Sequence, residues 1–296
     1  MPTCPAIPRI LTLLLLMLSG AIHAQDADAD EKAAMAAALA AERPIDAVAS
    51  AWLEKLTWME VRDAIASGTT TVIIPTGGIE ANGPYLSTGK HNAILEATCP
   101  VIARKLGNAL CAPVVAFVPE GDIEPPSGAM LFPGSISLRQ ATFEALLTDI
   151  ASSLRVHGFT DIVLIGDSGG NQAGMSKVAA RLNAEWPVAS RAHFVIDFYD
   201  PGWEATEDFT EQELGIRETR HDGYHDDIWV TAMMAVTDPE QIRYRQRMEA
   251  DLAAINGVDI RDLDATIALG EAMIEFRAGL TARAIRAAIV SSRERP

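Results

Sequence analysis

Short apolar runs alternate along the chain with longer segments whose apolar positions follow helical spacing. Apolar runs of roughly four to eight residues bounded by Gly or Pro are typical of strands, and apolar positions three and four apart are typical of helices. Strands are predicted at 69–74, 114–118, 161–165 and 193–199. Helices are predicted at 58–65, 92–106, 138–157 and 172–186, with two further amphipathic helices within 240–290.

This alternation predicts parallel βαβ units and a sheet covered by helices, which is an α/β fold. No internal repeat and no clear linker interrupts it, so we expect a single domain over 51–296. Functional sites in such sheets form in loops at the carboxyl ends of strands. Three loops in those positions carry polar residues: 77–91, 119–130 and 166–172.

The first 24 residues are typical of a secretion signal. Arg9 precedes the apolar run 10–18, and small residues lead to a cleavage position after Ala24. The run is shorter than the roughly 20 residues that span a bilayer, although an uncleaved anchor is the alternative. Residues 25–50 then form an acidic, alanine-rich leader. We expect a secreted protein, exported to a periplasm.

Charge and cysteine content narrow the range of partners. The 296 residues include 40 acidic and 24 basic side chains, giving a net charge of −16. This excess of negative charge argues against nucleic acid or an anionic membrane as the main partner. The partner that we expect is a small-molecule substrate. Three cysteines are too few for a disulfide-built scaffold. Cys99 and Cys111 could pair in an oxidising compartment or remain two buried thiols.

Glu80 and His91 form the first candidate site. Glu80 follows a buried strand in a Gly/Pro-rich turn, and His91 comes eleven residues later. A carboxylate and an imidazole brought together by one loop can begin a transition-metal site. The alternative is that both side chains cap backbone groups.

Residues 221–227 (His-Asp-Gly-Tyr-His-Asp-Asp) form the second candidate. A carboxylate beside an imidazole can orient it as a general base or support a metal ligand. A solvated acidic loop is the alternative. Glu120, Asp122 and Glu124 make the 119–131 loop acidic too, which hints at a cationic group on the substrate, although a solvated loop is the simpler interpretation.

Residues 166–170 (Gly-Asp-Ser-Gly-Gly) spell the nucleophile loop of trypsin-like proteases. Here the motif lies between a predicted strand and a helix, and no matching histidine segment precedes it. The spacing also differs from the Gly-x-Ser-x-Gly of α/β-hydrolases. Ser168 as a nucleophile is therefore a minor hypothesis.

The chain resembles the creatinine amidohydrolase (creatininase) family over roughly residues 55–236. Residues 77–86 (Gly-Gly-Ile-Glu-Ala-Asn-Gly-Pro-Tyr-Leu) resemble the family's Gly-Ser-x-Glu-Gln-His-Gly-Pro-His-Leu, and residues 132–136 (Phe-Pro-Gly-Ser-Ile) resemble its Phe-Pro-Gly-Thr-Ile. Residues 165–171 stand where the family has Asn-Gly-His-Gly-Gly-Asn after a strand, and residues 225–231 weakly match His-Ala-Gly-x-x-Glu-Thr.

The resemblance implies a three-layer α/β/α sandwich with a mostly parallel sheet, often assembled as a hexamer. It also implies hydrolysis of a C–N bond, often in a cyclic amide, by two divalent ions that activate water and polarise the carbonyl. Glu80 matches a family ligand, and His91 stands at the position of the bridging aspartate. Two family histidines and a glutamate are replaced by Asn82, Ser168 and Val230. These are weak ligands or none, so a standard two-ion site is not expected.

A rearranged site for one ion is the main hypothesis. Glu80, His91 and Asp167 would bind a single zinc or manganese ion, since three O/N ligands and a water suffice. His225 would act as general base or fourth ligand, oriented by Asp226. Substrate contacts are predicted for Asn82, Ser168 and Trp229. The alternative is a catalytically inactive relative that binds a small molecule or serves as an assembly subunit.

Overall fold

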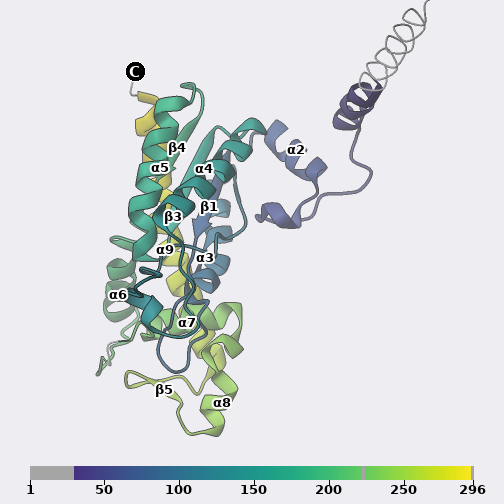
Figure 1. Ribbon diagram of the computed structural model, residues 1–296. Coiled ribbons are helices and arrows are strands. Elements are labelled where there is room, and N and C mark those ends of the chain that lie inside the picture. The colour runs from purple at the N-terminus through teal and green to yellow at the C-terminus, as the bar shows by residue number, and fades with distance from the viewer. Residues whose placement is uncertain (1–29, 222–223, 295–296) are drawn as a thin grey trace, which may run out of the picture. The chain divides into compact units, whose positions relative to one another are not determined.

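The computed structural model describes residues 30–221 and 224–294 (Figure 1). The predicted signal segment and the start of the leader lie outside these residues. Residues 30–40 are helical and belong to a unit, Met1–Ala47, separate from the compact unit Val48–Pro296. Among the residues that the structure describes, no helix has both the length and the apolar character needed to cross a membrane.

A four-stranded parallel sheet forms the centre of the larger unit, with the strand order β2-β1-β3-β4. Its strands are β1 (Thr71–Thr76), β2 (Ala109–Cys111), β3 (Asp161–Gly166) and β4 (Arg191–Phe194). Thr71 pairs with both Ala109 and Asp161, so the three strands begin at the same level. Their carboxyl ends therefore share one edge, as the α/β prediction requires.

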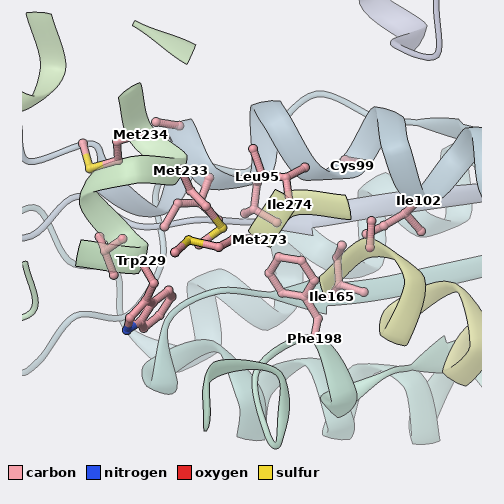
Figure 2. Close-up of a cluster of buried hydrophobic side chains, with 14 of the residues drawn as sticks. Leu95, Cys99, Ile102, Ile165, Phe198, Trp229, Met233, Met234, Met273 and Ile274 are labelled. Carbon is pink, nitrogen blue, oxygen red and sulfur yellow. The ribbon is translucent and has the colours of Figure 1, made fainter. Parts of the chain in front are cut away.

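Helices cover both faces of the sheet. Along β1 and β3 the residues alternate: Ile73, Val163 and Ile165 join one core, whereas Val72, Ile74, Ile162 and Leu164 join the other. The first core is completed by α3 (Lys90–Leu106), α7 (Ile228–Thr237) and α9 (Leu263–Glu294), and Figure 2 shows part of it. The second is completed by α2 (Trp58–Ala66), α4 (Gln140–Val156) and α5 (Gln172–Glu185). This is the three-layer α/β/α arrangement.

Two of the strand predictions were wrong in position. The second strand is Ala109–Cys111 rather than 114–118, where Val115 and Val118 make only isolated bridges. Pro113 lacks the N–H that a continuing ladder needs, which accounts for the early end of β2. The predicted strand 193–199 ends at Phe194, and Ile196–Phe198 turns into a short 3₁₀ helix.

The C-terminal third also differs from the prediction of two helices in 240–290. It contains the short helix α8 (Tyr244–Glu249), a hairpin of β5 (Ala254–Ile255) and β6 (Val258–Asp259), and the 32-residue α9. Helix α6 (Gly202–Gln212) lies in a segment for which no element was predicted. Short 3₁₀ helices complete the chain: η1 (Leu53–Lys55), η2 (Gly128–Leu131), η3 (Gly169–Asn171), η4 (Ile196–Phe198) and η5 (Pro239–Ile242).

Cys99 and Cys111 form a disulfide, the pairing that the sequence left open. Cys99 lies in α3 and Cys111 is the last residue of β2, and both are fully buried. The bond therefore ties α3 to the edge of the sheet.

Candidate active site at the carboxyl edge of the sheet

Three carboxyl groups and one imidazole meet at the carboxyl ends of the strands. Glu80 follows β1, Asp167 follows β3, Glu120 lies in the long loop after β2, and His91 is in the first turn of α3. Asn171 fastens the loop after β1 by donating from its side-chain amide to the backbone oxygens of Thr76 and Gly77. The βαβ topology thus gathers residues that are far apart in sequence.

His91 links two of these carboxylates. Its Nε2 lies 2.9 Å from Oε1 of Glu80, and its Nδ1 lies 2.7 Å from Oδ2 of Asp167. The predicted convergence of Glu80 and His91 is therefore present. A histidine held through Nδ1 by a carboxylate presents Nε2 in a fixed direction, which is the usual support for a metal-binding imidazole.

Two buried cations complete the cluster, and our sequence analysis identified neither. Lys90 Nζ lies 3.1 Å from Oε1 of Glu80. Arg277 of α9 donates from Nη2 to Oδ1 of Asp167 at 2.7 Å and to the backbone oxygen of Phe198. Both side chains are completely buried, so each is stabilised chiefly by its carboxylate partner. No local pattern marks Arg277, because its partner lies 110 residues away.

These contacts move the pKa values of the cluster in opposite directions. Burial alone would raise the pKa of Glu80, but the imidazoles of His225 and His91 and the ammonium of Lys90 hold it well below its usual range. Burial alone would also raise the pKa of Asp167, but Arg277 and His91 lower it to about 2. Glu80 and Asp167 are therefore carboxylates at neutral pH.

Glu120 is the functional candidate that the loop interpretation missed. Asp122 and Glu124 are exposed as expected, whereas Glu120 is 7% exposed. Ser168 Oγ donates to its Oε2 at 2.9 Å, and within the described residues its buried Oε1 has no hydrogen-bond partner. Burial, together with the Glu80 charge, raises the pKa of Glu120 to about 7. A solvated loop is therefore the wrong interpretation for this residue.

Gly78 makes room for that carboxyl group. A Cβ atom at this position would lie 1.9 Å from Oε1 of Glu120 and 3.2 Å from Cδ2 of His91. The absence of a side chain at residue 78 thus allows Glu120 to approach His91 closely.

The donor set fits one divalent cation. One oxygen of Glu80, one nitrogen of His91 and one oxygen of Glu120 lie within 4.8 Å of one another. Ligand atoms about 2.1 Å from a common ion lie up to about 4.2 Å apart, so small movements of these side chains suffice to bring all three atoms onto one ion. Asp167, predicted as a ligand, has its two oxygens engaged by His91 and Arg277. That geometry suits a residue that orients His91 better than one that binds an ion.

His225 and Asp226 have different environments. The side chain of His225 is 66% exposed, and its Nδ1 lies 3.9 Å from Oε1 of Glu80. Asp226 is 1% exposed and packs against Gly83, where a Cβ would lie 2.2 Å from its Oδ2. His225 therefore reaches the site from the solvent side, whereas orientation of His225 by Asp226 stays a prediction.

The three residues predicted to contact substrate also have different environments. Ser168 bonds to Glu120, a carboxylate rather than the imidazole that a serine nucleophile would need. The buried Asn82 donates to the backbone oxygen of Glu80. Trp229 is 3% exposed and lies in the core (Figure 2). Its ring is edge-on to that of Trp203, with the centroids 4.7 Å apart. Helix α7 turns this side chain inward, and the substrate contact of Trp229 stays a prediction.

A cavity of about 550 Å³ opens beside the cluster. Glu80 and His225 contribute to its lining, together with Pro84, Ala129, Phe132 and Tyr224. The cavity is large enough for a small molecule and places it against the Glu80 carboxylate and the His225 imidazole. His221, in contrast, lies 3.6 Å from Asp227 in a separate surface group with Glu218.

Comparison with known proteins identifies the family. The family model for creatininase, described as creatinine amidohydrolase, matches residues 54–282. The creatinine amidohydrolase of Pseudomonas putida is 28% identical over 116 residues, which is 39% of this chain and 44% of that protein. The mycofactocin precursor peptide peptidase of Mycolicibacterium smegmatis is 29% identical over 119 residues, 38% of this chain and 45% of that protein. The chain thus spans less than half the length of these two relatives.

Solved structures agree on the fold. A creatininase mutant complexed with creatine has a TM-score of 0.57 at 20% identity, covering 80% of this chain and 98% of that one. A manganese creatininase has a TM-score of 0.55 at 20% identity, covering 83% of this chain and 99% of that one. A mutant creatininase of the Zn–Zn type has the same TM-score and identity, covering 83% of this chain and 100% of that one. With the family model matching more than half of its length, this chain belongs to the creatininase family.

Proposed function

We propose that the protein is an exported amidohydrolase that cleaves a C–N bond in a small amide or cyclic amide, using a single zinc or manganese ion. The convergence of Glu80, His91 and Glu120 within 4.8 Å, beside an open cavity, is the observation that carries this proposal. Zinc and manganese forms of related structures support the choice of metal.

Each residue of the cluster has a part in this proposal. Glu80, His91 and Glu120 would hold the ion, which when bound would polarise the amide carbonyl and lower the pKa of a water molecule. Asp167 fixes the imidazole of His91, and the Ser168 hydroxyl holds one oxygen of Glu120 so that the other faces the cluster. His225 lines the cavity and is the group that can give a proton to the departing nitrogen.

Metal content together with hydrolysis tests the proposal. Elemental analysis of the purified protein is expected to find near-stoichiometric zinc or manganese in wild type and little in Glu80→Ala or His91→Ala. A panel of small linear and cyclic amides should then be hydrolysed by wild type only, with Glu124→Gln as the control for a lost charge in an exposed position. Hydrolysis that survives complete metal removal would contradict the proposal.

A second candidate is a catalytically inactive relative that binds a small molecule or acts as an assembly subunit. The pairing of Lys90 with Glu80 and of Arg277 with Asp167 favours it, because both carboxylates already have cationic partners without any ion. A protein that contains no metal, binds an amide in the cavity and leaves it intact would establish this alternative.

Export and oligomeric state are further parts of the proposal. The Cys99–Cys111 disulfide supports an oxidising compartment, since such bonds are rare in a reducing cytosol. Cell fractionation and the N-terminal sequence of the mature protein test export, with cleavage expected after Ala24. Native mass spectrometry tests assembly, for which we expect a homo-oligomer, most simply the hexamer implied by the family resemblance.

A further inference from the structure

Lys90 stands where helix energetics disfavour a lysine. It is the first residue of the 17-residue helix α3, the preceding Gly89 provides no side-chain cap, and the first turn contains no acidic residue. The helix macrodipole places partial positive charge at this end, so a cation here is destabilising. The side chain is also completely buried. Helix stability therefore does not account for a lysine at this position.

The ammonium group occupies space beside the candidate metal ligands. Lys90 Nζ lies 3.1 Å from Oε1 of Glu80, and the same oxygen lies 2.9 Å from Nε2 of His91. The ring of Trp203, with its centroid 5.2 Å from Nζ, packs against the ammonium. A fixed positive charge thus contacts the carboxylate that would otherwise bind or bridge metal ions.

Charge counting limits how many ions the site can hold. Three carboxyl groups, those of Glu80, Glu120 and Asp167, are accompanied by the cations of Lys90 and Arg277. With all three carboxyls ionised, a single negative charge is left uncompensated. One divalent ion changes this to a single positive charge, whereas two ions would leave three positive charges in a buried site, where like charges repel strongly.

We propose that the Lys90 ammonium takes the place of one divalent ion at Glu80 and thereby restricts the site to a single ion. This inference rests on the proposed function for the presence of the remaining ion. It extends that function by naming the residue that prevents a second ion from binding.

Metal stoichiometry and affinity test the inference independently of activity. Chelator-stripped wild type and Lys90→Met are titrated with Zn²⁺ and with Mn²⁺ by calorimetry, and bound ions are counted by native mass spectrometry. Methionine keeps an apolar stem of similar length and deletes the charge. We expect at most one ion in wild type, and in Lys90→Met either an additional ion or binding at least about tenfold tighter. Lys105→Met, near the other end of α3, is the matched control and should behave as wild type.

Two ions bound by wild type would overturn the inference, as would the same count and affinity in wild type and Lys90→Met, including no binding in both. If Lys90→Met does not fold, Lys90→Gln replaces it, because its amide can still donate to Glu80 without carrying charge. One ion without amide hydrolysis contradicts the proposed function alone. Two ions with hydrolysis contradict the inference about Lys90 and the single-ion part of the proposed function, and leave the amidohydrolase activity in place.

Discussion

Oδ2 of Asp167 lies 2.7 Å from Nδ1 of His91, although 76 residues separate the two in the sequence. This contact fixes the imidazole so that Nε2 is directed at Glu80. The other oxygen of Asp167 accepts from the buried guanidinium of Arg277. The orientation of the candidate metal ligand thus depends on a charge in α9, the last helix of the chain.

Removing the Arg277 charge should destabilise the whole domain. In Arg277→Met the completely buried carboxylate of Asp167 loses its cationic partner, and breaking a buried pair in this way costs about 3–5 kcal/mol of the free energy of unfolding. Urea unfolding measures the difference. Arg245→Met is the control, because Arg245 pairs with Glu240 at the surface and its loss should cost less than about 1 kcal/mol. Equal losses in the free energy of unfolding for the two variants would contradict the claim that burial makes the Arg277–Asp167 pair costly to break.

The raised pKa of Glu120 predicts a stability change near neutral pH in the metal-free protein. The pKa of this carboxyl rises from 4.5 to about 7 in the folded state, so its contribution is fully present below pH 4.5 and is lost as pH rises through about 7. Glu120→Gln does not titrate. From pH 4.5 to about 8 the variant should therefore gain up to about 3 kcal/mol relative to wild type.

Urea unfolding of chelator-treated proteins across this pH range measures that difference, and Glu124→Gln controls for the loss of a carboxyl group from the same loop. A wild-type-minus-variant difference that does not change with pH would show that Glu120 ionises as freely in the folded protein as in the unfolded chain.

Gly78 is predicted to be intolerant of even one added methyl group. In Gly78→Ala the new Cβ would lie 1.9 Å from Oε1 of Glu120, so the carboxyl group must move away from His91. Displacement of a site group by about 1 Å can lower a rate about 100-fold, and we expect a loss of that order in amide hydrolysis together with weaker metal binding. Gly89→Ala is the control, because the nearest atom to its Cβ, Nδ2 of Asn92, is 3.9 Å away. Normal metal binding by Gly78→Ala would contradict the prediction.

The disulfide should contribute measurably to stability. Cys99 and Cys111 are 12 residues apart, and closing a loop of this size stabilises a protein by about 2–4 kcal/mol, mainly by restricting the unfolded chain. Cys99→Ser/Cys111→Ser should therefore unfold at lower urea concentration than wild type. Reductant should destabilise wild type and leave the double variant unchanged. A thiol assay that finds both cysteines free in the exported protein would contradict the pairing.

Local sequence pattern predicted the strands at 71–76 and 161–166 well, because both are apolar runs covered by helices on each face. It misplaced the strand near 114–118, where Val115 and Val118 are buried, Phe117 is exposed and no ladder forms beyond Pro113. The spacing and composition of an apolar run indicate which residues are buried. Burial by itself does not specify which backbone groups form the hydrogen bonds of a sheet.

The sequence by itself determined the parallel α/β organisation and the resemblance to the family, and it identified a glutamate and a histidine eleven residues apart as a candidate pair. All of these follow from local runs and motifs. Only the tertiary structure decided that Glu120 is buried beside them and that Lys90 and Arg277 neutralise two of the carboxylates. The physical reason is that the charge state of a site depends on which groups share a low-dielectric interior. Arg277 of helix α9 reaches that interior although it is 110 residues from Asp167 in the sequence. A local sequence pattern cannot indicate a contact between residues so far apart.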